Sequence, residues 1–281
     1  MKDHWPLAIS TGCCRGATLP AVLSALAAAG ADRVEIGTPP EHFDAGDRLQ
    51  AWSLAADLSR APFTLASIHA PFGAGCDMAS SRAEHREAAI DGALNAARDI
   101  AGQPGGIVVA HPSDLPREGG DTRERLRCAL ESLLLVDAAC RNFGLRLAIE
   151  TPLPHLVGGH PDEIGWLLER LPAGAGVCLD TGHAHLGRYI DAFIDVAGSR
   201  LIHVHLHDNR STYDDHLIPG EGHIDWCALF DRLRRAGYAG TLVMELSCSQ
   251  PSVDHFRNAL DAARRLCHAH APQRLTSGAP S

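Results

Sequence analysis

The segment RLIHVHLHD, residues 200–208, alternates aliphatic and histidine side chains. Side chains point to opposite faces along a β-strand, so His203, His205 and His207 share one face, and Val204 and Leu206 share the other. The aliphatic face suits packing against helices, which turns the other face inward. Three buried imidazoles are costly unless something ligates them or hydrogen-bonds to them. We therefore expect a polar centre inside this fold, formed in part by His203, His205 and His207.

Five other apolar runs also end on a histidine or a carboxylate. They are TLASIH, GIVVAH, LRLAIE, GVCLD and TLVME, which end at His69, His111, Glu150, Asp180 and Glu245. Polar residues at the carboxyl ends of apolar strands are where a (β/α)8 barrel places catalysis. Together with His205, these endings predict one shared metal site. Three loop residues complete the set of candidate metal ligands: His183, Asp214 and His216.

Apolar runs alternate with helical patterns throughout the chain. We expect strands at 6–11, 33–37, 64–69, 106–111, 145–150, 176–180, 200–206 and 241–246. We expect helices at 18–29, 47–60, 81–101, 121–142, 161–171, 188–198, 225–236 and 251–268. This order predicts a single-domain α/β fold, a (β/α)8 TIM barrel over residues 1–268, followed by a disordered tail at 269–281. A doubly wound open sheet is the alternative, although no GxGxxG follows the first strand.

Strand alternation also predicts what lines the barrel axis. Five of the strand-end ligands share their face with a small residue two positions earlier: Ser67, Val109, Ala148, Cys178 and Val243. Glu35, at the end of the second strand, also points inward. This much charge at one barrel mouth requires compensation, because buried charges must be paired or must coordinate a metal.

Composition narrows the classes of function. The net charge of −9 argues against a nucleic-acid-binding surface, which is usually basic. Lys2 is the only lysine, which excludes a Schiff-base mechanism and a P-loop lysine. No stretch approaches the roughly 20 apolar residues of a membrane span. The polar start of the chain is unlike a signal peptide and predicts a cytoplasmic protein.

The chain contains nine cysteines, and none follows CxxC spacing. Several lie inside apolar segments, which predicts small buried thiols in a reducing compartment. Cys13 and Cys14 end the first predicted strand, so either of them is a candidate to face the site.

With these residues placed, the chain resembles the xylose-isomerase-like TIM-barrel superfamily. That group includes sugar phosphate isomerases and epimerases, inosose isomerases and endonuclease IV. The resemblance covers roughly residues 6–265. Its most specific segments are HAPFG at 69–73, CLDTGHAHLG at 178–187, HLHDN at 205–209 and DDHLIPGEGHIDW at 214–226.

Resemblance to the isomerases and epimerases implies a centre for one divalent ion, Mn or Zn, with Fe, Co or Mg as alternatives. Its ligands would be Glu150, Asp180, His205 and Glu245. The substrate would be a small sugar, keto-polyol or sugar phosphate, with Glu150 and Glu245 transferring a proton through an enediolate. The residues expected to contact the substrate are His183, Arg210, His207 and Glu35.

Resemblance to endonuclease IV implies instead that all nine candidate ligands hold up to three zinc ions, with phosphoester hydrolysis as the reaction. The sequence departs from the DNA enzymes in three loops. APFG at 70–73 lacks bulky wedge residues, GTPPEHFDAGD at 37–47 is acidic, and Asn209-Arg210 replaces a serine–lysine pair. The alternative function is therefore a multinuclear hydrolase of a small phosphoester.

Three more classes of function stay open for such a barrel: a lyase, a multinuclear iron oxidase, and a non-enzymatic sugar-binding or metal-binding module. The expected partner is a small molecule rather than nucleic acid or a membrane. A homodimer is a guess that nothing in the sequence tests.

Overall fold

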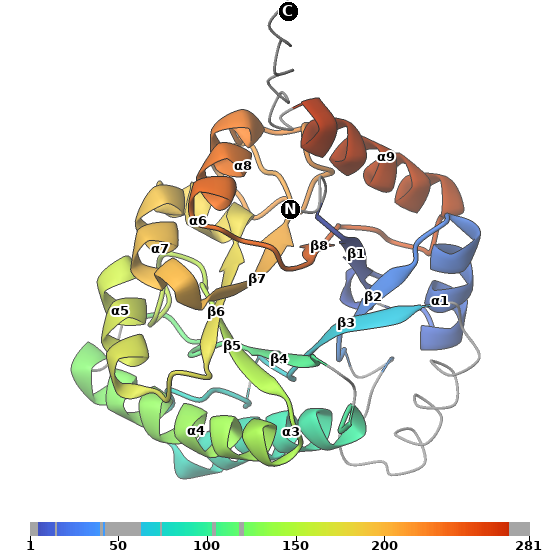
Figure 1. Ribbon diagram of the computed structural model, residues 1–281. Helices are drawn as coiled ribbons and strands as arrows, with labels where there is room; N and C mark the ends of the chain where they lie inside the picture. Colours follow the sequence, from blue (N-terminus) through green and yellow to red (C-terminus); the bar gives the residue numbers. More distant parts are fainter. Residues whose placement is uncertain are drawn as a thin grey trace, which may run out of the picture.

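A closed ring of eight parallel strands forms the centre of the molecule, and helices pack around its outside (Figure 1). The computed structural model describes residues 5–14, 16–39, 42, 63–73, 75–102, 105–117 and 121–269. The strands are β1 Leu7–Ser10, β2 Arg33–Ile36, β3 Thr64–His69, β4 Ile107–Ala110, β5 Arg146–Glu150, β6 Gly176–Asp180, β7 Leu201–Leu206 and β8 Leu242–Met244. All the expected strands are present, which confirms the (β/α)8 barrel.

The helices lie close to their expected positions. Those described are α1 Leu19–Ala28, α3 Ala83–Asp99, α4 Thr122–Asn142, α5 Pro161–Arg170, α6 Thr181–Gly187, α7 Ile190–Ala197, α8 Trp226–Arg235 and α9 Val253–Ala269. The helix expected at 47–60 lies outside the described residues, as does the expected tail from residue 270 onward. None of the described helices is long and apolar enough to cross a membrane.

Helix α6 was not expected from the sequence. It follows β6 directly, and Asp180 Oδ1 accepts a hydrogen bond of 2.7 Å from the backbone N–H of His183 in its first turn. The segment TGHAHLG contains two glycines, which have low helix propensity, and it is too short to show a helical period. The capping carboxylate is thus both a candidate ligand and the start of the helix that carries His183.

Small side chains fill the barrel interior, whereas larger aliphatic ones cover its outer face. The inner set includes Ala8, Ala66, Val109, Ala148, Cys178 and Val243. Val204, Leu206 and Met244 instead belong to the main core between barrel and helices. The polar strand ends face the axis, as the alternation predicts, but Ile202 departs from the alternation and joins the inner set where the pairing of β6 with β7 shifts register.

Pairing of β1 with β8 closes the barrel, with Ala8 beside Val243. The closure brings the loops after these two strands together, and Cys14 forms a disulfide with Cys248 there. The prediction that the cysteines are simple buried thiols is wrong for this pair and for Cys227, which is free but exposed; it holds for Cys140, Cys178 and Cys267, which are free and buried. The pair is separated by 234 residues, so the proximity follows from barrel closure rather than from local spacing.

A buried carboxylate organises the long loop between β7 and α8, residues 207–225. The two oxygens of Asp208 accept hydrogen bonds of 2.9 to 3.1 Å from the backbone N–H groups of Asn209, Gly220 and Ile224 and from Trp226 Nε1. Gly222 packs so closely that a Cβ there would collide with Asp208 Oδ1. The loop carries Asp214 and His216, and His216 has a positive φ of 49°.

Asp208→Asn is expected to lower the free energy of unfolding by about 3 kcal/mol, because an amide NH2 group would face two buried donors and leave them unsatisfied. Asp215→Asn is the matched control, since Asp215 in the same loop accepts one hydrogen bond, from Arg210 N, that an amide oxygen can also accept. Denaturant unfolding with a chelator present measures both variants. Equal losses in the two variants would contradict the anchoring role of Asp208.

Candidate metal centre

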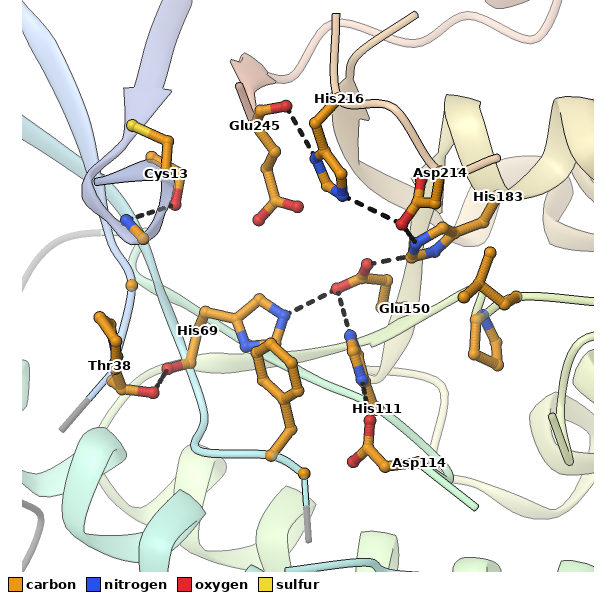
Figure 2. A pocket seen from close by; sticks show the side chains of 18 of the residues that line it. Cys13, Thr38, His69, His111, Asp114, Glu150, His183, Asp214, His216 and Glu245 are labelled. Atoms are coloured by element: carbon orange, nitrogen blue, oxygen red, sulfur yellow. Dashed lines mark hydrogen bonds and ion pairs between the residues drawn. The ribbon is translucent and has the colours of Figure 1, made fainter. Parts of the chain in front are cut away.

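One cavity of about 640 Å³ opens at the carboxyl ends of the strands. Its walls include His69, His111, Glu150, His183, Asp214, His216 and Glu245. Asp180 and His205 are fully buried beside these residues. Figure 2 shows the labelled ligands His69, His111, Glu150, His183, His216 and Glu245 around one space. The structure therefore brings together all nine candidate ligands that the sequence singled out.

The central group contains Glu150, Asp180, His205 and Glu245, each of which offers one ligand atom within 4.8 Å of the others. Its shared point is His205 Nδ1. This nitrogen lies 3.5 Å from Glu150 Oε2, 3.5 Å from Glu245 Oε1 and 4.0 Å from Asp180 Oδ2. Three carboxylates thus surround one imidazole nitrogen, which is a donor set suited to a divalent ion.

Two further groups flank the central one. His69 and His111 both reach Glu150 Oε2 through Nε2, at 2.8 Å and 3.2 Å. On the other flank, Asp214 Oδ2 lies 3.3 Å from His183 Nε2 and 3.1 Å from His216 Nε2. Because Glu150 belongs to two groups, it could bridge two neighbouring ions.

The candidate histidines share one hydrogen-bonding arrangement. The ring nitrogen turned away from the cluster donates to a fixed acceptor at 2.6 to 3.1 Å: His69 to Ala70 O, His111 to Asp114 Oδ1, His183 to Thr151 O, His205 to Glu35 Oε2 and His216 to Glu245 O. In a neutral ring the other nitrogen then keeps its lone pair. Metal-ligating histidines are oriented in this way, so the residues present fit a metal centre.

Glu35 has a different position from the one expected. It is fully buried, and its Oε2 accepts hydrogen bonds from Ser67 Oγ at 2.6 Å, His203 Nε2 at 3.2 Å and His205 Nε2 at 3.1 Å. It does not line the cavity. The predicted substrate contact is therefore corrected: Glu35 holds the ring of His205 so that Nδ1 faces the carboxylates.

His207 is also corrected. It is fully buried, its Nε2 lies 2.9 Å from Asp180 Oδ1, and its ring stacks on His216 with centroids 3.9 Å apart. Arg210 is exposed on the loop after β7, and its contact with a substrate stays a prediction. Of the four residues expected to contact the substrate, His183 lines the cavity.

Sequence patterns missed several residues of the site. Asp114 holds His111 at 2.6 Å, and its position three residues after that histidine was the available signal. Thr38 Oγ1 donates to the backbone carbonyl of His69 at 2.9 Å. Phe72 is 46% exposed, and its ring centroid lies 4.5 Å from that of His111. An exposed aromatic ring at this rim suits packing against a ligand.

The pKa values of the two central glutamates are shifted in opposite directions. Burial acts to raise the pKa of Glu150, but the charges of His111 and His205 outweigh it and hold that pKa well below its usual range. Burial raises the pKa of Glu245 above its usual value, with His205 opposing and Glu150 reinforcing the rise. Opposed shifts in neighbouring carboxyl groups are typical of an acid–base pair.

The sequence matches the profile of the family described as xylose isomerase-like TIM barrel over residues 23–266, and the chain belongs to this family. An uncharacterised protein of Methanocaldococcus jannaschii is 25% identical over 186 residues, which cover 63% of each chain. An uncharacterised protein of Sinorhizobium fredii is 32% identical over 114 residues, which cover 39% of this chain and 36% of that one. The chain thus spans less than two thirds of the length of either relative.

Several solved structures share the fold. A D-tagatose 3-epimerase-like protein superposes with a TM-score of 0.83 at 20% identity, over 94% of this chain and 98% of that chain. D-psicose 3-epimerase from Clostridium cellulolyticum H10 gives 0.75 at 18% identity, over 93% and 99%. The 3-keto-D-glucoside 4-epimerase of E. coli gives 0.72 at 16% identity, over 93% and 99%. Likeness at these identities establishes the fold.

Divalent ions are expected to bind this centre more tightly as the pH rises from 7 toward 9. In the ion-free protein, burial acts to lower the pKa of both His216 and His183. For His216, the neighbouring Asp214 outweighs burial and raises the pKa to about 9. For His183, Asp180 and Asp214 together outweigh burial and raise the pKa to about 10. Both rings are then protonated at pH 7, and an ion bound in the group of His183, Asp214 and His216 must displace those protons.

Calorimetric titration with Zn²⁺ in buffers of different ionisation enthalpy would measure this proton release. His216→Asn should release fewer protons than the wild type, whereas His223→Asn, on the exposed part of the same loop, should leave the number unchanged. Binding heats that do not depend on the buffer would show that the rings are already neutral.

Proposed function

We propose that the protein is a divalent-metal-dependent isomerase or epimerase of a small sugar, keto-polyol or sugar phosphate. The observation that carries this proposal is the position of Glu150 and Glu245. Glu150 ends β5 and Glu245 follows β8, which are not neighbours in the barrel, yet both side chains reach within 3.5 Å of His205 Nδ1. The named epimerases that share the fold support this class of reaction.

The ion would be held by the central group of Glu150, Asp180, His205 and Glu245. His205 Nδ1 is buried and has no hydrogen-bond partner in the described part of the chain, which supports a cation at this point. The mixed donors suit Mn or Zn, with Fe, Co or Mg as alternatives. When bound there, the ion would polarise a substrate carbonyl and lower the pKa of the neighbouring C–H bond.

Glu150 and Glu245 would move the proton. The low pKa of Glu150 keeps it ionised and able to take a proton from carbon, and the C–H electron pair then enters an enediolate. Glu245, which lies 3.5 Å from the same imidazole nitrogen as Glu150, would return the proton to carbon. Return to the same carbon from the other face gives an epimer, and return to the adjacent carbon gives an isomer.

The cavity suits a substrate of this size. Its volume of about 640 Å³ lies within the range of small-molecule sites. Apolar side chains on one part of the wall, Phe72, Leu153 and Leu156, would pack against carbon atoms and exclude water. His183, which also lines the cavity, would hydrogen-bond to a substrate hydroxyl.

In D2O, the wild-type protein is expected to exchange a carbon-bound hydrogen of a ketose for deuterium, which NMR of a ketose panel including D-tagatose would detect. Glu150→Gln and Glu245→Gln should each lower kcat by about 10³-fold, because an amide cannot relay the proton. Glu221→Gln, on an exposed part of the loop after β7, is the control and should keep full activity. Complete absence of exchange across the panel would refute the proposed reaction.

A multinuclear hydrolase of a small phosphoester is the second candidate. The observation that favours it is the pair of complete flanking groups, His69 with His111 and His183 with Asp214 and His216. Together with the central group they would hold up to three ions. Clustered zinc ions activate water and stabilise the leaving oxygen of a phosphoester.

Elemental mass spectrometry of the purified protein distinguishes the two candidates. We expect about one tightly held ion per chain, unchanged in His111→Ala and in the exposed-residue control His223→Ala. Two or three ions, falling by one in His111→Ala or in His216→Ala, would move the hydrolase ahead of the epimerase, or a multinuclear oxidase if the metal were iron.

A further inference from the structure

Three cysteine sulfurs meet where the loops after β1 and β8 touch. Cys13 Sγ lies 3.7 Å from Cys14 Sγ and 3.9 Å from Cys248 Sγ, and the latter two form the disulfide. Cys13 and Cys248 line the cavity. Cys13 and Glu245 lie in the upper part of Figure 2, and the charge of Glu245 acts on the Cys13 thiol.

The third sulfur is not placed for thiol–disulfide exchange. In-line attack requires the attacking sulfur to lie on the extension of the S–S bond, and therefore closer to one sulfur than to the other by roughly 2 Å. Cys13 Sγ is instead almost equidistant from both. It faces the side of the bond, so exchange does not account for its position.

Three sulfurs in a triangle can instead coordinate a metal ion. Zinc–sulfur bonds of about 2.3 Å place three thiolates around one ion at mutual distances of about 4 Å. The two separations that involve Cys13 are close to this value. We propose that the reduced protein binds one thiophilic cation, such as Zn²⁺, Cd²⁺ or Cu⁺, between Cys13, Cys14 and Cys248, at a site separate from the histidine–carboxylate centre.

Binding of the cation requires reduction of the disulfide first and loss of the thiol protons second. A dithiol reductant breaks the Cys14–Cys248 bond, supplies two electrons and two protons, and is itself oxidised to a disulfide. A divalent ion then displaces the protons of three thiols into water. Burial and the nearby Glu245 carboxylate raise the pKa of Cys13 to about 12, so its thiol stays protonated until a cation binds.

The two metal sites differ in the softness of their ligands, and therefore in the ions they prefer. Thiolates select Cu⁺, Zn²⁺ and similar ions, whereas carboxylate-rich sites accept Mn²⁺ and Mg²⁺. The remaining free cysteines offer no comparable cluster in the described residues, since every cysteine group there that could hold an ion includes Cys13 or is completed by histidines. The site depends on the barrel closure alone and not on the reaction proposed above.

Ultraviolet absorption during titration of the full chain with Cd²⁺ tests the site. The protein is first reduced with a dithiol, desalted without oxygen and saturated with Mn²⁺ at the histidine–carboxylate centre. We expect a thiolate-to-cadmium charge-transfer band that saturates at one equivalent. Cys13→Ser should weaken Cd²⁺ binding at least tenfold, and Cys248→Ser should do the same.

Cys227→Ser is the matched control, because Cys227 is a free, exposed cysteine on α8. Its band and affinity should equal those of the wild type. A charge-transfer band that Cys13→Ser leaves intact, or no band in the reduced wild type, would overturn the site. Neither result would bear on the epimerase proposal, since no turnover is measured.

Discussion

One oxygen of one carboxylate, Glu150 Oε2, is shared by three imidazoles, and the barrel mouth depends on that contact. This oxygen lies 2.8 Å from His69, 3.2 Å from His111 and 3.5 Å from His205, and the residue is 1% exposed. A buried carboxylate without such partners would be strongly destabilising. The contact therefore draws the ends of β3, β4, β5 and β7 to one point, and positive charge, as protons or as a cation, has to be present there.

Much of this architecture could be predicted from the sequence, because β-strand alternation is a local property. The small inner residues, the strand order and the convergence of the candidate ligands all follow from the period of two and the barrel class. How deep an inward-facing side chain lies along the barrel axis does not follow from this alternation. Glu35 and Glu245 share an inward direction, yet the first lies buried beneath His205 and the second opens onto the cavity.

Contacts between residues far apart in the chain could not be predicted from the sequence either. The disulfide between Cys14 and Cys248 arises because the first and last strands pair, which no spacing motif records. His207 was expected to contact the substrate, but its ring stacks on His216, its Nε2 hydrogen-bonds to Asp180, and it belongs to the possible ligand group of His183, Asp214 and His216. Alternation gives the direction of a side chain, whereas its neighbours depend on how loops after other strands fold over it.

His216 joins two of the ligand groups through the backbone. Its Nδ1 donates to the carbonyl of Glu245, and its own carbonyl accepts from Ser247 N at 2.9 Å, while its backbone has the unfavourable φ of 49°. A substitution of His216 would therefore do more than remove one side chain. It would also loosen the backbone that presents Glu245, which follows β8, whereas His216 lies in the loop after β7.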